Sequence, residues 1–205
     1  MITIVDYGMG NLRSVAKALE HLGASATLTS DPGEIARAEK LVLPGVGAFG
    51  AAMTELKRRQ LVEPIRKAIG SGTPYLGICL GLQLLFESSE EAPGVAGLGL
   101  LAGTVKKFRD PSLKVPHMGW NQIARAKTAG LQDHLLEGIP DGSYCYFVHS
   151  YYAQPSDETL VTLRTAYGMP FASMVARERL FATQFHPEKS QAVGLRLLEN
   201  FLTLA

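Results

Sequence analysis

The sequence predicts an α/β fold in which a mostly parallel sheet has helices on both of its faces. Two observations carry this prediction. In the first half of the chain, short apolar runs alternate with stretches whose apolar residues recur every three or four positions, the pattern of strands alternating with amphipathic helices. From Gly103 onward, short strand-like runs follow one another with few helical signals, which indicates antiparallel hairpins that extend the sheet or form a smaller one beside it.

The first half reads as strands and helices in turn. A buried strand is predicted at residues 2–6, and a turn-rich loop follows it at residues 7–11. A helix begins at Leu12, because its apolar residues keep to one stripe and Gly23 can end it. The other predicted elements of this half are strands at residues 26–29, 40–43 and 74–78, and one or two helices over residues 51–69 with an interruption near Pro64.

The second half is predicted to be rich in strands. These strands lie at residues 104–108, 120–124, 144–148, 160–165, 171–176 and 180–185. Residues 191–204 then close the chain as an amphipathic helix with an apolar inner face. No repeat, low-complexity segment or linker interrupts the pattern, so residues 1–205 are expected to form one domain.

Composition excludes several function classes. The 205 residues carry 20 basic and 19 acidic side chains, and no basic run is longer than residues 57–59, which argues against a nucleic-acid partner. The two cysteines, Cys79 and Cys145, are too few for a disulfide scaffold and are typical of a reducing compartment. Because we find neither a signal-peptide pattern nor an apolar run long enough to cross a bilayer, we expect a cytoplasmic protein without a membrane partner.

The most informative motif is Gly77-Ile78-Cys79-Leu80-Gly81. An apolar run precedes it and a helix-like run at residues 82–87 follows, so Cys79 is predicted at a sharp strand-to-helix turn, as in a nucleophile elbow. A thiol at a helix N-terminus is activated, because the unpaired N–H groups favour the thiolate. The alternative is a buried structural cysteine, which is how we interpret Cys145 within its apolar run.

A second polar motif, His186-Pro187-Glu188, follows the strand predicted at residues 180–185. In an extended chain residues i and i+2 point to the same side, and Pro187 keeps the residue before it extended. His186 and Glu188 are therefore expected to project together, with the carboxylate fixing the tautomer of the imidazole. Combined with Cys79, they would supply a nucleophile, a base and a group that orients the base.

A glycine-rich loop at residues 44–50 follows the strand at residues 40–43. In open α/β sheets, sites form along the carboxyl ends of the strands, and such a loop can present backbone N–H groups to an anion. We interpret it as part of an oxyanion hole beside Cys79. A dinucleotide site is less favoured, because the acidic residue that such a site requires is missing from its expected place. A plain strand-to-helix turn is the third interpretation.

The elbow, His186-Pro187-Glu188 and the glycine loop together resemble the class I, triad-type glutamine amidotransferases, and the resemblance covers essentially the whole chain. It implies a flavodoxin-like sheet and a covalent mechanism. Cys79 would attack the side-chain amide of glutamine, His186 would transfer protons, and Glu188 would orient His186. A γ-glutamyl thioester would form and be hydrolysed by water. No cofactor is expected, and no group of His, Cys and carboxylate residues has zinc-ligand spacing.

The resemblance also implies a set of residues at the substrate and at the oxyanion. These are Val46, Gly47, Leu80, Gln83, Glu91, Ser150 and Tyr151. The N–H of Leu80 and an N–H of the Val46–Gly47 loop would meet the oxyanion, while Gln83 lies one helical turn beyond the thiol. Glu91 would pair with the substrate ammonium. A satisfied helix amide at Gln83 and a solvated charge at Glu91 are the alternatives.

Three runs resemble one branch of the family, the glutaminase subunits that pass ammonia to a synthase subunit in histidine biosynthesis. The runs are residues 44–49, 115–121 and 146–151. This branch implies a heterodimer with a synthase subunit that is a (β/α)₈ barrel. The residues expected at the docking surface are Asn11, Met118, Trp120, Tyr146 and Lys189. For His117 and His149 we expect a structural or interface role rather than catalysis.

Three other functions stay open. The chain could be a glutaminase for another ammonia-using synthase, such as those of purine, folate or pyridoxal phosphate synthesis. A cysteine peptidase or a γ-glutamyl hydrolase could use the same elbow. A binding module without catalysis is the third alternative, because flavodoxin-like folds host many functions.

Overall fold

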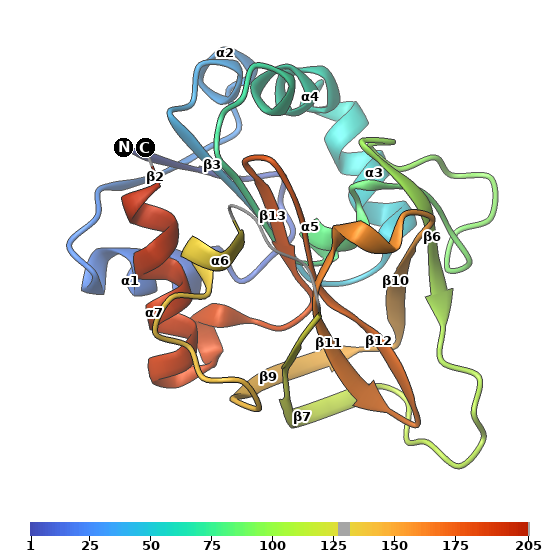
Figure 1. The fold of residues 1–205 in the computed structure, drawn as a ribbon. Coiled ribbons are helices and arrows are strands. Elements are labelled where there is room, and N and C mark those ends of the chain that lie inside the picture. Colours follow the sequence, from blue (N-terminus) through green and yellow to red (C-terminus); the bar gives the residue numbers. More distant parts are fainter. Residues whose placement is uncertain (127–131, 205) are drawn as a thin grey trace.

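The computed structural model describes residues 1–126 and 132–204, and within them an eight-stranded sheet forms the centre of the molecule (Figure 1). The strand order is β2-β1-β3-β4-β13-β12-β11-β8. The parallel strands are β1 (Ile2–Val5), β2 (Ala26–Thr29), β3 (Lys40–Gly45), β4 (Tyr75–Cys79) and β13 (Leu180–Thr183). The antiparallel strands are β12 (Met169–Arg177), β11 (Val161–Tyr167) and β8 (Ala124–Arg125). The α/β fold with an antiparallel extension is thereby confirmed.

Two smaller sheets stand beside the central one. One has the order β10-β6-β5 and is built from β10 (Tyr151–Pro155), β6 (Leu101–Lys107) and β5 (Phe86–Ser89). The other is the antiparallel pair of β7 (His117–Gln122) and β9 (Tyr144–His149). Residue 150 therefore lies where the chain passes from one small sheet to the other.

Helices cover both faces of the central sheet (Figure 1). One face packs against α2 (Pro32–Ala36), α3 (Phe49–Arg58) and α4 (Val62–Gly70). The other packs against α1 (Leu12–His21), α6 (Gln132–Leu135) and α7 (Gln191–Thr203). Alternate strand residues serve the two faces: in β3, Leu41 and Leu43 belong to the first core and Val42 to the second. Burial on both faces explains why these strands read as continuous apolar runs.

Two helix predictions need correction. The break between α3 and α4 lies at residues 59–61, where Gln60 has φ 58°, and Pro64 sits in the first turn of α4. Proline is tolerated there because the first N–H groups of a helix have no partner within the helix. The helix expected at residues 82–87 is only α5 (Leu80–Gln83), and the chain continues into β5 at Phe86.

Several short elements were not predicted. Helix α2 begins with Asp31 as N-cap, whose carboxylate accepts from the Glu34 N–H, followed by Pro32. This cap signal was present in the sequence but was not used. Strand β10 and helix α6 were also missed. None of the helices that the structure describes combines the length and the apolar character needed to cross a membrane.

Candidate active site

Cys79 ends strand β4 and stands at the N-terminus of helix α5. Its backbone has φ 55° and ψ −104°, a combination that residues other than glycine rarely adopt. Such strain persists only where the surrounding structure enforces it, and it is concentrated at functional sites. The sharp strand-to-helix turn that the sequence predicts is therefore present, with the thiol at its tip.

The glycines on either side of this turn are required by close backbone contacts. A Cβ atom on Gly81 would lie 1.9 Å from the carbonyl oxygen of Leu43 in β3. One on Gly77 would lie 2.7 Å from the carbonyl oxygen of Gly81. A side chain at either position would force the backbone of α5 away from β3 or β4. The spacing of the motif thus follows from the way α5 crosses over β3 and β4.

His186 and Glu188 form a buried hydrogen-bonded pair, with Nδ1 of the ring 2.8 Å from Oε1 of the carboxylate. Their side chains are 2% and 1% exposed. The expected reason for this pairing was wrong. Strand β13 ends at Thr183, and Pro187 opens a 3₁₀ turn, η2 (Pro187–Lys189), for which His186 is the N-cap. The turn, rather than an extended chain, brings the two side chains together.

The Cys79 thiol and the His186 ring interact electrostatically. His186 Nε2 nevertheless has no hydrogen-bond partner. Cys79 Sγ lies 3.8 Å from the Val148 carbonyl oxygen and accepts from Gln184 Nε2 at 3.6 Å. Burial alone lowers the pKa of His186, but its interactions with Cys79 and Glu188 outweigh that effect and raise the pKa well above its ordinary value. Catalytic hydrogen bonds often tighten only when substrate binds, so this geometry is compatible with proton transfer.

A cavity of about 310 Å³ opens over the thiol. Its lining residues are Val46, Gly47, Cys79, Leu80, Gln83, Glu91, Pro116, Val148, His149, Ser150 and Tyr151. All seven residues predicted at the substrate or the oxyanion are among them. His186 and Glu188 do not line the cavity, and both side chains are buried.

Two of these residues make contacts that bear on the alternatives left open for them. Gln83 Nε2 donates to the Tyr151 carbonyl at 2.9 Å and to Gln184 Oε1 at 3.1 Å, so its amide donors are satisfied within the protein. Glu91 Oε2 accepts from the Phe49 N–H at 2.7 Å. That contact places a carboxylate at the N-terminus of α3, where the helix dipole favours it. Glu91 is therefore held in place at the cavity edge rather than free in solvent.

Sequence reasoning missed Gln184 and Tyr7. Gln184 is fully buried and touches both the thiol and Gln83. The only available signal was its place two residues before His186. Tyr7 is also fully buried, its hydroxyl has no hydrogen-bond partner, and burial together with the charge of Cys79 raises its pKa. Nothing in its loop sequence marks this burial.

The residues expected at a docking surface gather around the β7–β9 pair. Met118 and Trp120 are 61% and 47% exposed. Trp120 lies opposite Tyr146 with the ring centroids 6.0 Å apart, and Lys189 Nζ lies 5.8 Å from the Tyr146 ring centroid. Asn11 precedes α1, which contacts η2. The surface role of these residues stays a prediction.

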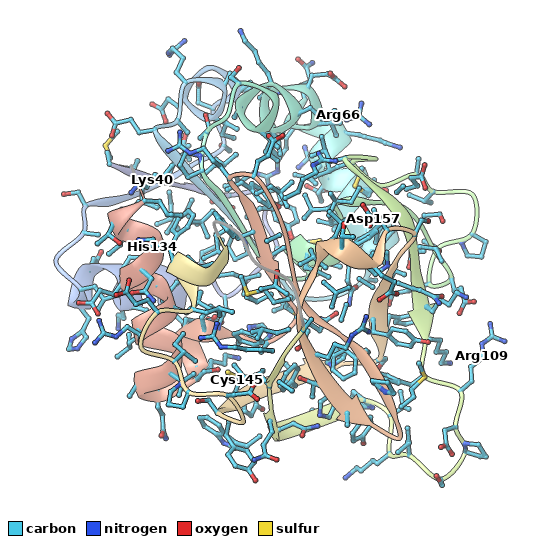
Figure 2. The ribbon with its side chains drawn as sticks, viewed as in Figure 1. Lys40, Arg66, Arg109, His134, Cys145 and Asp157 are labelled. Atoms are coloured by element: carbon cyan, nitrogen blue, oxygen red, sulfur yellow. The ribbon has the colours of Figure 1, made fainter. Side chains whose placement is uncertain are left out.

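Other parts of the structure agree with more ordinary roles. Cys145 of β9 is fully buried, as expected, and burial raises its pKa to about 12. Arg109 extends outward at the edge of the molecule (Figure 2). Among the residues that the structure describes, no group of three or more His, Cys, Asp and Glu side chains is placed to hold a metal ion.

The sequence matches the class-I glutamine amidotransferase family over residues 3–205. The chain belongs to this family. The imidazole glycerol phosphate synthase subunit HisH of Rhodopirellula baltica is 55% identical over 204 residues, which cover 99% of this chain and 97% of that protein. The protein of the same name from Syntrophotalea carbinolica is 52% identical over 207 residues, covering 98% of each.

Solved structures of lower identity share the fold. A crystal structure of a glutamine amidotransferase superimposes with a TM-score of 0.76 at 20% identity, covering 98% of this chain and 97% of that one. The structure of PurLQS from Thermotoga maritima gives 0.72 at 20% identity, covering 98% and 96%. The predicted family, fold and enzyme class are thereby confirmed, and the roles of individual residues in the glutamine amidotransferase reaction are taken up as proposals.

Proposed function

We propose that this family member is the glutaminase subunit of an imidazole glycerol phosphate synthase in histidine biosynthesis. It hydrolyses L-glutamine to glutamate and passes the ammonia to a synthase subunit that makes imidazole glycerol phosphate and an aminoimidazole carboxamide ribotide. The names of relatives that are 55% and 52% identical over nearly the whole chain support this assignment. The observation that carries the chemistry is the strained Cys79 at the floor of a cavity, with the His186–Glu188 pair next to it.

Cys79 is the nucleophile of the proposed reaction. Its sulfur attacks the side-chain amide carbon of glutamine, and a C–S bond forms as the C–N bond breaks. His186 holds the proton that left the thiol and returns it to the departing nitrogen, which leaves as ammonia. Water then attacks the γ-glutamyl thioester with His186 as base, which releases glutamate and restores the thiol. Glu188 keeps the ring in one tautomer and stabilises its protonated form.

Backbone N–H groups on two elements are placed to stabilise the oxyanion. Leu80 follows the nucleophile as the first residue of α5, and its N–H is free of helical bonding. Gly45 of β3 pairs with Cys79, so the Val46–Gly47 loop that continues from it borders the same cavity. One such donor is typically worth about 2.7–4 kcal/mol of the barrier.

The cavity favours a small substrate over a peptide. Its volume of about 310 Å³ lies at the lower end of the range of ligand sites, which is about 300–1,000 Å³. Glu91 supplies a carboxylate for the ammonium group of glutamine, and the backbone of Ser150 and Tyr151 supplies polar atoms on the opposite wall. Because the amide donors of Gln83 are already bonded, its role is to hold the Tyr151 backbone, with its oxygen left for substrate.

The partner in this proposal is a (β/α)₈ barrel subunit that docks on the surface formed by Asn11, Met118, Trp120, Tyr146 and Lys189. Exposed Met118 and Trp120 are of the residue types enriched at an interface centre. The barrel receives ammonia from the cavity. We expect little hydrolysis by the isolated chain, because the glycines of the Val46–Gly47 loop leave the oxyanion donor mobile until the partner orders it.

The test is glutamine hydrolysis with and without the barrel subunit, in the wild type and in Cys79→Ala. Cys145→Ala is the matched control, because it removes the other buried thiol away from the cavity. We expect hydrolysis only in the assembly, lost in Cys79→Ala and kept in Cys145→Ala, while ammonium salts still support synthesis in all three. Full glutamine-dependent activity without the Cys79 thiol would end the proposed mechanism. Failure to assemble with this barrel would favour a different synthase.

A further inference from the structure

Two buried histidines stand next to the cavity without a part in the proposed reaction. His117 opens β7 and His149 ends β9, and the two residues are directly opposite in the antiparallel register. Their side chains are 4% and 6% exposed. His117 Nδ1 lies 2.9 Å from His149 Nε2, and His149 Nδ1 lies 2.8 Å from the Tyr151 carbonyl oxygen. Both rings are thus hydrogen-bonded despite their burial, as buried polar groups normally are.

The direction of each hydrogen bond in this series is fixed by the Tyr151 carbonyl at its end. A carbonyl oxygen can only accept, so His149 Nδ1 carries the proton and donates to Tyr151. In a neutral ring the Nε2 atom then accepts, which makes His117 Nδ1 the donor between the two rings. His117 Nε2 in turn accepts from the Asn121 amide at 3.1 Å. Each member therefore has one assigned tautomer or orientation.

Aromatic rings hold both histidines in place. His117 stacks between Tyr167 and Phe147 with centroid distances of 4.0 and 5.0 Å. His149 lies 5.1 Å from the Phe171 ring and 5.4 Å from that of Phe108. This packing restricts ring rotation, so the hydrogen-bond chain behaves as a stiff connection.

The connection ends at the junction between the two small sheets. Residue 150 separates β9 from β10, and the two strands belong to different sheets. The Tyr151 carbonyl points back into this junction and accepts from both His149 Nδ1 and Gln83 Nε2. Gln83 in turn reaches Gln184, which touches the thiol. Strand β10 pairs with β6 on one side only, so on its free edge the Tyr151 carbonyl is held by side chains.

We propose that His117 and His149 are positioning residues: their hydrogen-bonded pair fixes the Tyr151 carbonyl, and with it the substrate wall of the cavity, from strand β7. This inference rests on the proposed function, because the wall matters to a reaction only if glutamine occupies the cavity. Strand β7 carries Met118 and Trp120 on its opposite face, so the same strand joins the proposed docking surface to this wall.

The test compares variants that remove the donor with variants that keep it. His117→Phe keeps an aromatic ring between Tyr167 and Phe147 but cannot donate to His149. His149→Phe likewise keeps a ring but cannot donate to the Tyr151 carbonyl. His117→Asn and His149→Asn keep an N–H near the Nδ1 position. The assay is glutamine hydrolysis by the assembly with the barrel subunit. His21→Asn, on the exposed surface of α1, is the control.

We expect each Phe variant to raise KM for glutamine about five- to tenfold, the size of one neutral hydrogen bond, with kcat nearly unchanged. The Asn variants should return KM to within about twofold of the wild type, as that hydrogen bond is remade. The double Phe variant should be no worse than His149→Phe alone, because both residues act through one connection. A packing role would instead lower the amount of folded enzyme without moving KM.

If a Phe variant does not fold, His117→Gln replaces it, because the longer side chain displaces the donor from His149 without adding bulk. Wild-type hydrolysis with the same KM in every folded variant would overturn this inference alone. Equal impairment of the Phe and Asn variants would also overturn it. Absence of hydrolysis in the wild-type assembly would overturn the proposed function, and this inference with it.

Discussion

Acidification is expected to destabilise the protein through its buried histidine pair. Burial lowers the pKa of His117 to about 4 and that of His149 to about 3, from an ordinary value of 6.5. In the unfolded chain both rings titrate near their ordinary pKa, so protonation favours unfolding. The stability that these two groups contribute is therefore complete above pH 6.5 and is lost as the pH falls toward their folded pKa values.

The size of the effect follows from the width of this window. Between about pH 7.5 and about pH 5, each ring gains about one proton in the unfolded chain and almost none in the folded one. The interval below the unfolded pKa spans about 1.5 units, and each unit corresponds to about 1.36 kcal/mol. Each histidine thus costs about 2 kcal/mol, and the pair about 4 kcal/mol, out of a typical total of about 5–15 kcal/mol.

Urea unfolding of the wild type and of His149→Asn at the two pH values measures this contribution. We expect the loss of unfolding free energy on acidification to be about 2 kcal/mol smaller in the variant, because Asn does not titrate. His186 acts in the opposite sense: its pKa is raised, so its contribution is complete below pH 6.5 and is lost only as the pH rises. It is present in both proteins and cancels in the difference. An identical pH dependence of the unfolding free energy in the two proteins would refute the argument.

Two further predictions concern the elbow. Cys79→Gly should raise the unfolding free energy by about 1 kcal/mol relative to Cys79→Ala, because glycine adopts φ 55° without strain. Paired urea titrations of the two variants measure this difference. A Gly variant less stable than the Ala variant would contradict the assignment of strain. Gly81→Ala should lower the unfolding free energy by about 3 kcal/mol or more, because its Cβ would lie 1.9 Å from the Leu43 carbonyl oxygen. The same change at Gly70, where a Cβ meets no atom within 4 Å, is the matched control, and equal stability of the two variants would show that this contact is not tight.

The fold could be predicted well wherever the pattern is local. Apolar runs such as residues 2–5 and 40–43 are buried on both faces, so they read directly as parallel strands. Prediction failed where a run with helical residues forms a short strand instead. The run after Gln83 has helical residues, yet it turns into β5 because Phe86 pairs with Leu101 of β6. Propensity is a weak guide when tertiary pairing decides the conformation.

For the site, the sequence indicated which residues to consider but not how they meet. Cys79, His186 and Glu188 stood out by motif. Gln184 had no signal except its place before His186, and Tyr7 had none; they emerge from a hydrogen bond to the thiol and from an electrostatic interaction with it, respectively. The His117–His149 bond was equally hidden, since it depends on the register of β7 against β9.

The sequence by itself indicated the elbow through its motif, although of its two glycines only Gly77 answers a clash within the turn, while Gly81 answers one with Leu43 of β3. It also determined the alternation of strands and helices through apolar periodicity. Only the tertiary structure decided that β13 lies beside β4, with Thr183 opposite Ile78, and so that His186 arrives next to the thiol. The physical reason is that strand pairing over such a separation is selected by burial of the whole sheet, which no local pattern encodes.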